Sequence, residues 1–301
     1  MSGNSLAGNG AGVKASGSYS AHLQGFNVTD CVFTGNTVTG LYKNGGAIYL
    51  QYFDNSRVTD TTFVNNTASA DGGGAHFRSS SNATLTNTTF VNNTASYGGG
   101  GGVSFTSSAN ATLTDTTFEN NMAYYGGGVS FTSSANATLT NTTFENNTVS
   151  NYGGGASFYD SANATLTDTT FENNTAESGG GGASFYDSAN ATLTDTTFEN
   201  NTVSNSGGGA SFTSSANATL TDTTFENNTA ESGGGGASFY DSANATLTDT
   251  TFVNNTAYNG GGAHFAGSED ATLTDTTFEN NTAEIDLGGG AYFTSSEDAT
   301  L

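Results

Sequence analysis

The feature that most constrains this chain is a unit of about 27 residues that recurs along almost its whole length. Each copy carries the motif F-x-x-N. Its phenylalanine stands at positions 33, 63, 90, 118, 144, 171, 198, 225, 252 and 278. A second motif, G-G-G-[AV]-x-F, keeps the same period, as at residues 153–158. A fixed period of this size predicts a stack of identical supersecondary units, so function has to be sought on surfaces that repeat.

One unit, residues 179–206, shows what each copy builds. Glycine-rich, S-A-N and E-N-N segments are typical of turns, and they separate A-S-F, A-T-L-T-D-T-T-F and N-T-V. Apolar and polar residues alternate within these stretches, as at Ala183 and Phe185, which favours strands. The alternation slips by one residue near Asp195, which predicts a bend or bulge there. The chain contains no proline and shows no helical periodicity.

Three short strands and three turns per unit predict an all-β fold, a single-stranded parallel β-helix of about ten rungs. Rungs of such a stack lie about 4.8 Å apart, so equivalent residues are superposed. Of the 21 Phe, 19 occupy two rung positions, which indicates two internal ladders flanked by an asparagine ladder. The central members of these ladders are Phe144, Phe171, Phe198 and Phe225; Phe158, Phe185, Phe212 and Phe239; and Asn147, Asn174, Asn201 and Asn228.

The paired motifs resemble those of the polymorphic outer-membrane proteins of chlamydiae and of adhesin-like right-handed β-helix proteins. Here they stand as G-G-A-I at residues 45–48, F-T-G-N at 33–36, and their copies. The resemblance covers roughly residues 26–301. It implies a right-handed helix and an extracellular, adhesive or structural passenger domain. Unlike the chlamydial proteins, this chain has no C-terminal barrel segment and only one cysteine.

The repeats define the expected domains. Residues 1–25 are rich in Gly and Ser and only loosely repeat-like, so we expect an irregular N-terminal segment there. Residues 26–301 are expected to form the β-helix domain. Because the sequence stops at Leu301, midway through a rung, we expect this domain to continue beyond 301 or to stack end to end on another copy.

The charge of the chain limits its partners. The net charge is −23, and the only basic residues are Lys14, Lys43, Arg57 and Arg78. Phosphate backbones and anionic lipid surfaces need clustered Lys or Arg, so nucleic acid and anionic membranes are not expected as partners. No apolar run is long enough to predict insertion into a membrane. The expected partners are further copies of the chain, other surface proteins, or glycans.

A ladder of threonine pairs follows the T-L-T segments. Such flat hydroxyl arrays resemble those of ice-binding β-helices, although Thr is also an ordinary strand surface residue. The candidate ice face is formed by Thr165, Thr167, Thr192, Thr194, Thr219 and Thr221.

Acidic residues also recur at fixed rung positions. Asp195, Asp222 and Asp249 belong to one such ladder. Like charges so close together repel unless they are screened or bridged, so these residues are candidates for a cation ladder that binds Ca²⁺ or Na⁺. The favoured interpretation is a solvated acidic coat, and no metal or cofactor is expected.

The sequence contains 18 N-x-[ST] sequons. In a secreted protein, exposed sequons predict a glycoprotein, although a chain this rich in Asn and Thr also forms sequons by chance. The candidates at the S-A-N and S-S-N turns are Asn82, Asn110, Asn136, Asn163, Asn190, Asn217 and Asn244.

The sequence predicts no catalytic residues and no enzyme. Carboxylate catalysis needs two carboxylates in different environments, whereas here each has near-identical copies. His76 and His264 replace the serine of G-G-A-S-F and are expected to be surface variants. A tyrosine patch, formed by Tyr124, Tyr125, Tyr159, Tyr186 and Tyr240, is a candidate for sugar stacking, or else ordinary exposed tyrosine.

These observations favour a non-catalytic, extracellular surface rod that serves as a stalk, adhesin or filament subunit. An ice-binding protein is the first alternative. A β-helix that binds or degrades polysaccharide is the second.

Overall fold

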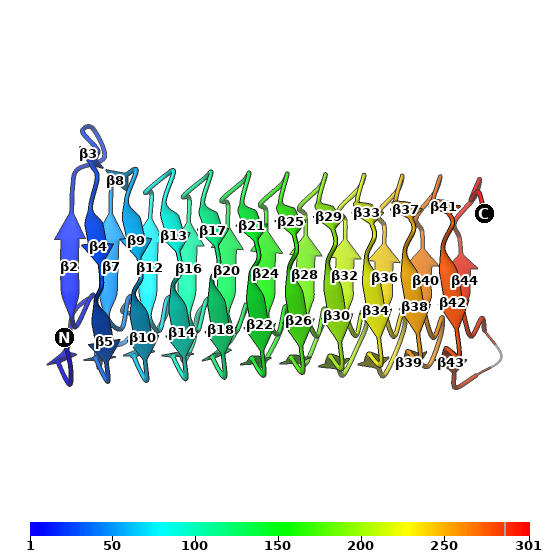
Figure 1. The fold of residues 1–301 in the computed structure, drawn as a ribbon, viewed down its shortest axis with the longest axis horizontal. Helices are drawn as coiled ribbons and strands as arrows, with labels where there is room; N and C mark the ends of the chain where they lie inside the picture. The colour runs from blue at the N-terminus through cyan, green and yellow to red at the C-terminus, as the bar shows by residue number, and fades with distance from the viewer. Residues whose placement is uncertain (286) are drawn as a thin grey trace.

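Short strands stack rung upon rung into a straight rod, with the two chain ends at opposite tips (Figure 1). The structure is a computed structural model that describes residues 1–285 and 287–301. Within these residues there is no helix, and neighbouring rungs pair in parallel throughout, as β28 with β32 and β29 with β33. The predicted all-β solenoid of about ten rungs is therefore confirmed. Accordingly, the described residues contain no helix of the length and hydropathy needed to cross a membrane.

Sheet I follows the glycine run of each rung. Its strands are β2 (Val13–Ser16), β7 (Ile48–Gln51), β12 (Ala75–Arg78), β16 (Val103–Thr106), β20 (Val129–Thr132), β24 (Ala156–Tyr159), β28 (Ala183–Tyr186), β32 (Ala210–Thr213), β36 (Ala237–Tyr240), β40 (Ala263–Ala266) and β44 (Ala291–Thr294).

Sheet II contains the T-L-T segments. Its strands are β4 (Asn27–Thr29), β9 (Arg57–Thr59), β13 (Thr84–Thr86), β17 (Thr112–Thr114), β21 (Thr138–Thr140), β25 (Thr165–Thr167), β29 (Thr192–Thr194), β33 (Thr219–Thr221), β37 (Thr246–Thr248) and β41 (Thr272–Thr274).

Sheet III carries the phenylalanine of F-x-x-N. Its strands are β5 (Val32–Thr34), β10 (Thr62–Val64), β14 (Thr89–Val91), β18 (Thr117–Glu119), β22 (Thr143–Glu145), β26 (Thr170–Glu172), β30 (Thr197–Glu199), β34 (Thr224–Glu226), β38 (Thr251–Val253) and β42 (Thr277–Glu279).

Sheet IV closes each rung with two-residue strands. They are β1 (Ser5–Leu6), β6 (Thr37–Val38), β11 (Thr67–Ala68), β15 (Thr94–Ala95), β19 (Met122–Ala123), β23 (Thr148–Val149), β27 (Thr175–Ala176), β31 (Thr202–Val203), β35 (Thr229–Ala230), β39 (Thr256–Ala257) and β43 (Thr282–Ala283). A separate pair, β3 (Leu23–Gln24) and β8 (Phe53–Asp54), lies near the N-terminal tip.

Each full rung has four strands, whereas the sequence predicts three. The long A-T-L-T-D-T-T-F stretch is divided at Asp195, whose φ of 49° places it in the left-handed region. Asp tolerates this conformation better than most residues, so the chain turns a corner there instead of continuing with a bulge. The buried Thr196 that follows donates from its Oγ1 to the carbonyl oxygen of Thr194 at 3.1 Å and stabilises the corner.

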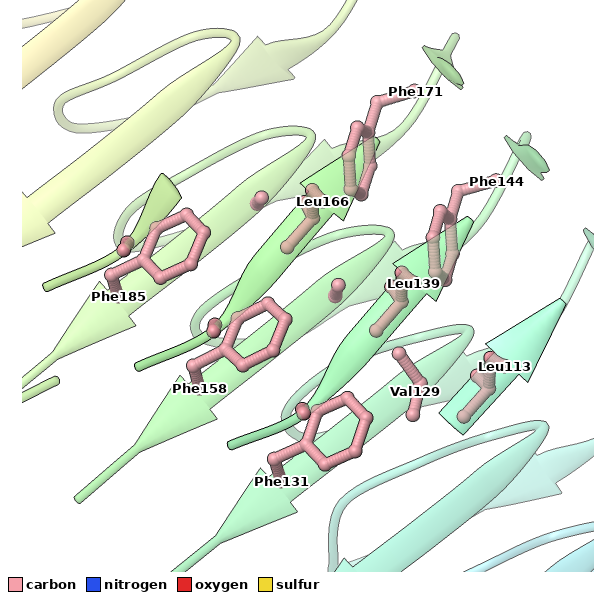
Figure 2. Packing of buried hydrophobic residues seen from close by; sticks show 14 of the residues in the cluster. Leu113, Val129, Phe131, Leu139, Phe144, Phe158, Leu166, Phe171 and Phe185 are labelled. Carbon is pink, nitrogen blue, oxygen red and sulfur yellow. The ribbon is translucent and has the colours of Figure 1, made fainter. Parts of the chain in front are cut away.

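The core is a set of columns that run along the rod. Figure 2 shows one column of Phe131, Phe158 and Phe185, another of Phe144 and Phe171, and leucines between them. Ring centroids of successive phenylalanines lie 4.6–5.1 Å apart along both columns, and the rings are almost parallel, as for Phe171 on Phe198 at 4.7 Å. These side chains are buried except for Phe278 and Phe293 at the C-terminal tip, which are partly buried, and their stacking fixes the register between rungs.

A buried asparagine ladder lies at the corner after sheet III. Asn174 Oδ1 accepts from the backbone N–H and the Nδ2 of Asn147, both at 3.0 Å. Asn174 Nδ2 donates to the carbonyl oxygen of Phe144 at 2.9 Å and to Asn201 Oδ1 at 3.0 Å. The same pattern repeats from Asn66 to Asn255, so each side chain joins three rungs.

The glycine run is required by close packing of the backbone. A Cβ on Gly181 would lie 2.3 Å from the carbonyl oxygen of Gly208 and 2.8 Å from that of Thr202. Gly180 has a φ of 63°, in the left-handed region that favours glycine. The run therefore brings the start of sheet I against the rung above it, at a place where no side chain fits.

Residues 1–25 join the stack at its N-terminal tip. β1 pairs with β6, β2 pairs with β7, and β3 pairs with β8. The proposed domain boundary at residue 25 stays a prediction.

Candidate functional site

The candidate site lies on the outer face of sheet I. Two columns of side chains point outward there. We call the first the serine column: Ser130, Ser157, Ser184, Ser211 and Ser238, continued by His264, in register from β20 to β40. We call the second the rim column: Thr132, Tyr159, Tyr186, Thr213, Tyr240 and Ala266.

The serine column is buried although it points out of the sheet. Ser211 is 6% exposed and Ser238 is 4% exposed. The reason is that the loop from sheet IV to sheet I folds over this column. Gly179, the residue that precedes the glycine triplet of its rung, lies against the Ser211 hydroxyl. A Cβ built on Gly179 would be 3.5 Å from Ser211 Oγ. The loop therefore forms a wall, and the serine column forms the floor of a groove parallel to the rod axis.

The height of the wall varies along the rod because the residue before the glycine triplet differs in size from rung to rung. The residues at this position are Gly99, Tyr125, Tyr152, Gly179, Ser206, Gly233 and Asn259, and isolated bridges link several of them from rung to rung. Small residues at 179, 206 and 233 open the wall over three consecutive rungs. A cavity of about 340 Å³ lies at this opening; Tyr152, Tyr186, Ser211, Ser238, Tyr240 and His264 are among its lining residues. We call this cavity, with those lining residues, the tyrosine groove.

A second hollow of about 250 Å³ lies closer to the N-terminus on the same face. Tyr125, Ser130, Thr132, Ser157 and Tyr159 line it. Between the two hollows, Tyr152 stacks parallel to Tyr125 with centroids 6.3 Å apart, and Tyr186 lies 6.2 Å from Tyr152 and 5.4 Å from Tyr159. Tyr125, Tyr152, Tyr186 and Tyr159 thus form a continuous aromatic strip that ends at Tyr186, and Thr213, one rung further on, separates it from Tyr240.

Of the two histidines of this face, His76 is buried and His264 is half-buried, so the prediction that they are surface variants is wrong for His76. His76 is 1% exposed, and its Nε2 lies 3.1 Å from Thr106 Oγ1. Burial lowers the pKa of His76 to about 4. Burial also lowers the pKa of His264, which stacks on Tyr292 at 5.3 Å and has space because Gly233 carries no side chain. Both imidazoles are therefore neutral near pH 7.

The threonine pairs form a regular array on sheet II. Thr165, Thr192 and Thr219 are in register, as are Thr167, Thr194 and Thr221. The pairs continue without interruption from β13 to β41, and most of these side chains are half-buried. The predicted ice face is thus placed on one sheet, on a different side of the rod from the tyrosine groove.

The structure places the acidic and sequon ladders at exposed corners. Asp195, Asp222 and Asp249 are exposed in left-handed turns, and the described residues contain no cluster of three or more His, Cys, Asp or Glu side chains suited to a metal ion. In the sequon ladder, the Nδ2 of Asn190 donates to Asn163 Oδ1 at 3.0 Å. Because a glycan is attached through Nδ2 and the sequons are one rung apart, glycans on neighbouring rungs would crowd each other. The candidate cation ladder and glycosylation sites stay predictions.

Sequence reasoning found four of the tyrosines that line the two hollows, Tyr125, Tyr159, Tyr186 and Tyr240, but missed the groove itself; Tyr124, also predicted, lines neither hollow. Tyr152, the serine floor and the open stretch of wall were not identified. The available signal was the residue before each glycine triplet, which changes from tyrosine at 125 and 152 to Gly179, Ser206 and Gly233. Alignment of the repeats on the glycine triplet makes this change visible.

Solved structures share this architecture at low sequence identity. The periplasmic alginate epimerase AlgG matches with a TM-score of 0.53 and 10% identity, over 92% of this chain and 73% of that protein. Tailspike protein 3 of bacteriophage CBA120 matches with a TM-score of 0.50 and 10% identity, over 95% of this chain and 49% of the tailspike. PfbA, a surface adhesin of Streptococcus pneumoniae, matches with a TM-score of 0.45 and 11% identity, over 89% of this chain and 74% of the adhesin. No curated protein sequence matches this chain.

The prediction that the chain is not an enzyme is wrong, since it treated repetition as an argument against catalysis. The same architecture occurs in the alginate epimerase, so a β-helix rod does not exclude enzymatic activity.

The family model described as the right handed beta helix region matches residues 1–176 and 140–301, which together cover the whole chain. This chain belongs to the right-handed β-helix family.

Proposed function

We propose that this protein is an extracellular surface rod that binds polysaccharide in the tyrosine groove. One observation carries the proposal: aromatic rings and hydroxyl groups converge in the tyrosine groove, and the neighbouring hollow on the same face has the same kinds of lining residues. Pyranose rings stack on tyrosine faces, and their hydroxyl groups need hydrogen-bonding partners, so both parts of the groove match a sugar. The groove runs along the rod, which suits a polymer.

Two further lines of support concern location. The G-G-A and F-x-x-N motifs resemble those of adhesin-like surface proteins. Solved structures with the same architecture include a periplasmic alginate epimerase and a phage tailspike. These likenesses support an extracellular setting, in which the rod holds a glycan-binding face away from its point of attachment. Self-association end to end stays a prediction.

The expected result is that the double variant Tyr186→Ala/Tyr240→Ala loses polysaccharide binding. Removal of both rings deletes two stacking surfaces, so affinity is expected to fall at least about tenfold, which corresponds to about 1.4 kcal/mol. Affinity electrophoresis against a panel of neutral and acidic polysaccharides measures this effect.

Tyr97→Ala is the matched control, since Tyr97 is 68% exposed and lines neither hollow. Its binding is expected to equal that of the wild type. If no polysaccharide retards the wild-type protein, or if the two variants behave alike, the proposed function is refuted.

Ice binding is the second candidate, because the in-register threonine pairs of sheet II form a long, flat array. If this array binds ice, the wild-type protein shapes ice crystals and Thr192→Tyr/Thr219→Tyr does not, because two bulky rings interrupt the face. Microscopy of single ice crystals checks this outcome. Growth of unfaceted, disc-shaped crystals in the presence of the wild-type protein would remove this candidate.

A further inference from the structure

The tyrosine groove also restricts the class of glycan that it accepts, an inference that rests on the proposed function. None of the residues that line the groove is an Asp, Glu, Lys or Arg. The one titratable imidazole, that of His264, is neutral because burial lowers its pKa. The lining is thus uncharged on a chain whose net charge is −23.

Carboxylates stand around the groove although none lies inside it. Asp187 and Asp241 directly follow the two rim tyrosines, and Glu177 and Glu231 directly precede two lining serines. All four are exposed. The four basic residues of the chain all lie within its first 78 residues, far along the rod from the groove. A uronic-acid polymer would therefore meet repulsion and find no counter-charge.

The floor of the groove offers hydrogen bonds that the protein itself does not use. The hydroxyl of Ser215, which lies in a corner ladder, donates to the carbonyl oxygen of Phe185 at 3.1 Å. By contrast, the hydroxyl groups of Ser211 and Ser238 make no hydrogen bond to any residue that the structure describes, and both line the groove. Two neutral groups, each able to donate and accept, are thus available to a ligand.

The spacing of the rim sets the length of the ligand. Tyr186 and Tyr240 are separated by the smaller Thr213, one rung from each. On the same strands, the ring centroids of Phe185 and Phe212 lie 4.8 Å apart, and so do those of Phe212 and Phe239, which gives the distance between rungs. A sugar ring in an extended glycan advances by a similar distance. In a ribbon-like chain every second ring presents the same face, so rings one and three would stack on the two tyrosines.

We propose that the tyrosine groove binds an uncharged, extended glycan of at least three sugar rings. The chain lies along the rod, with alternate rings on Tyr186 and Tyr240 and hydroxyl groups on Ser211 and Ser238. Acidic polysaccharides are excluded by the carboxylates around the groove.

Titration calorimetry of the full chain with neutral and acidic oligosaccharides of matched length tests this proposal. The neutral probes are cello-, xylo- and N-acetylchito-oligosaccharides; the acidic probes are oligogalacturonates and oligomannuronates. A neutral trisaccharide is expected to bind about tenfold more tightly than its disaccharide, since only the trisaccharide reaches both tyrosines. Tyr240→Ala is expected to remove this gain, so that the trisaccharide binds no more tightly than the disaccharide.

Oligouronates are expected to bind at least about tenfold more weakly at low salt, with a smaller difference at high salt, where the repulsion is screened. Equal or tighter binding of oligouronates would overturn the inference and leave glycan binding intact. A gain from disaccharide to trisaccharide that survives Tyr240→Ala would overturn the proposed placement. No heat with any probe, together with no retardation on any polysaccharide, would refute both the inference and the proposed function.

Discussion

Asn174→Ala is expected to destabilise the rod by about 3–5 kcal/mol, because each unpaired buried polar group costs about 1–3 kcal/mol. The change removes an acceptor from two donors of Asn147, the backbone N–H and Nδ2, and a donor from the carbonyl oxygen of Phe144. These groups are buried, so water cannot replace the lost partner. Urea denaturation followed by circular dichroism measures the effect.

The neighbouring Asn173→Gly provides a matched control. Asn173 is exposed, and its Nδ2 reaches only Glu172 Oε1 at 3.1 Å. Its φ of 56° is one that glycine adopts without strain, so the expected change is within about 1 kcal/mol. Equal destabilisation by the two variants would show that the buried ladder contributes no more than the surface.

The damage is expected to stay local. In a solenoid each rung contacts only its neighbours, so the loss of one ladder member weakens two interfaces directly. Hydrogen exchange of Asn174→Ala is expected to show the greatest loss of protection between residues 144 and 201, the span of the bonds that are broken. Uniform loss along the chain would instead indicate that the rod unfolds as one cooperative unit.

The repeat period was sufficient to predict the rungs, because identical residues at a fixed spacing are superposed when the units stack on one another. Stacking in register, as for Phe198 on Phe225 at 4.8 Å, is the arrangement of 27-residue units that buries so many equivalent rings. The number of corners was harder to predict. In the sequence, the alternation of apolar and polar residues slips by one residue near Asp195, as it would within a single strand. Only the left-handed backbone of Asp195 shows that the strand ends there.

The candidate site was harder to predict than the fold for a different reason. Alternation along β32 correctly places Ser211 on the outer face, but its burial depends on a loop that folds back over the sheet. The size of that loop's residues, from Tyr152 to Gly179, decides where the groove is open. This information is spread over neighbouring rungs, so the pattern within one repeat does not contain it.

Phe171→Ala is expected to cost about 3–5 kcal/mol, the range typical of truncating a buried phenylalanine. Phe171 is completely buried and stacks on Phe144 and on Phe198, each at 4.7 Å. The half-buried Phe53, which lies outside both columns, is the control, and Phe53→Ala is expected to cost less than half as much. Thermal unfolding of both variants gives the comparison, and similar costs would argue against the stacked column as a main source of stability.

A double-mutant cycle with Gly155 tests why the two sequence motifs occur together. A Cβ on Gly155 would lie 2.7 Å from Cδ1 of Phe171, so Gly155→Ala alone forces the ring to move. In the Phe171→Ala background that clash is absent, although contacts with Phe144 Cβ at 2.9 Å and the Gly182 carbonyl oxygen at 3.0 Å remain. Gly155→Ala is therefore expected to cost about 1 kcal/mol less in the double variant than alone. Strict additivity would mean that the glycine triplet serves only the backbone, whereas the expected coupling shows that G-G-G and F-x-x-N are two halves of one packing contact.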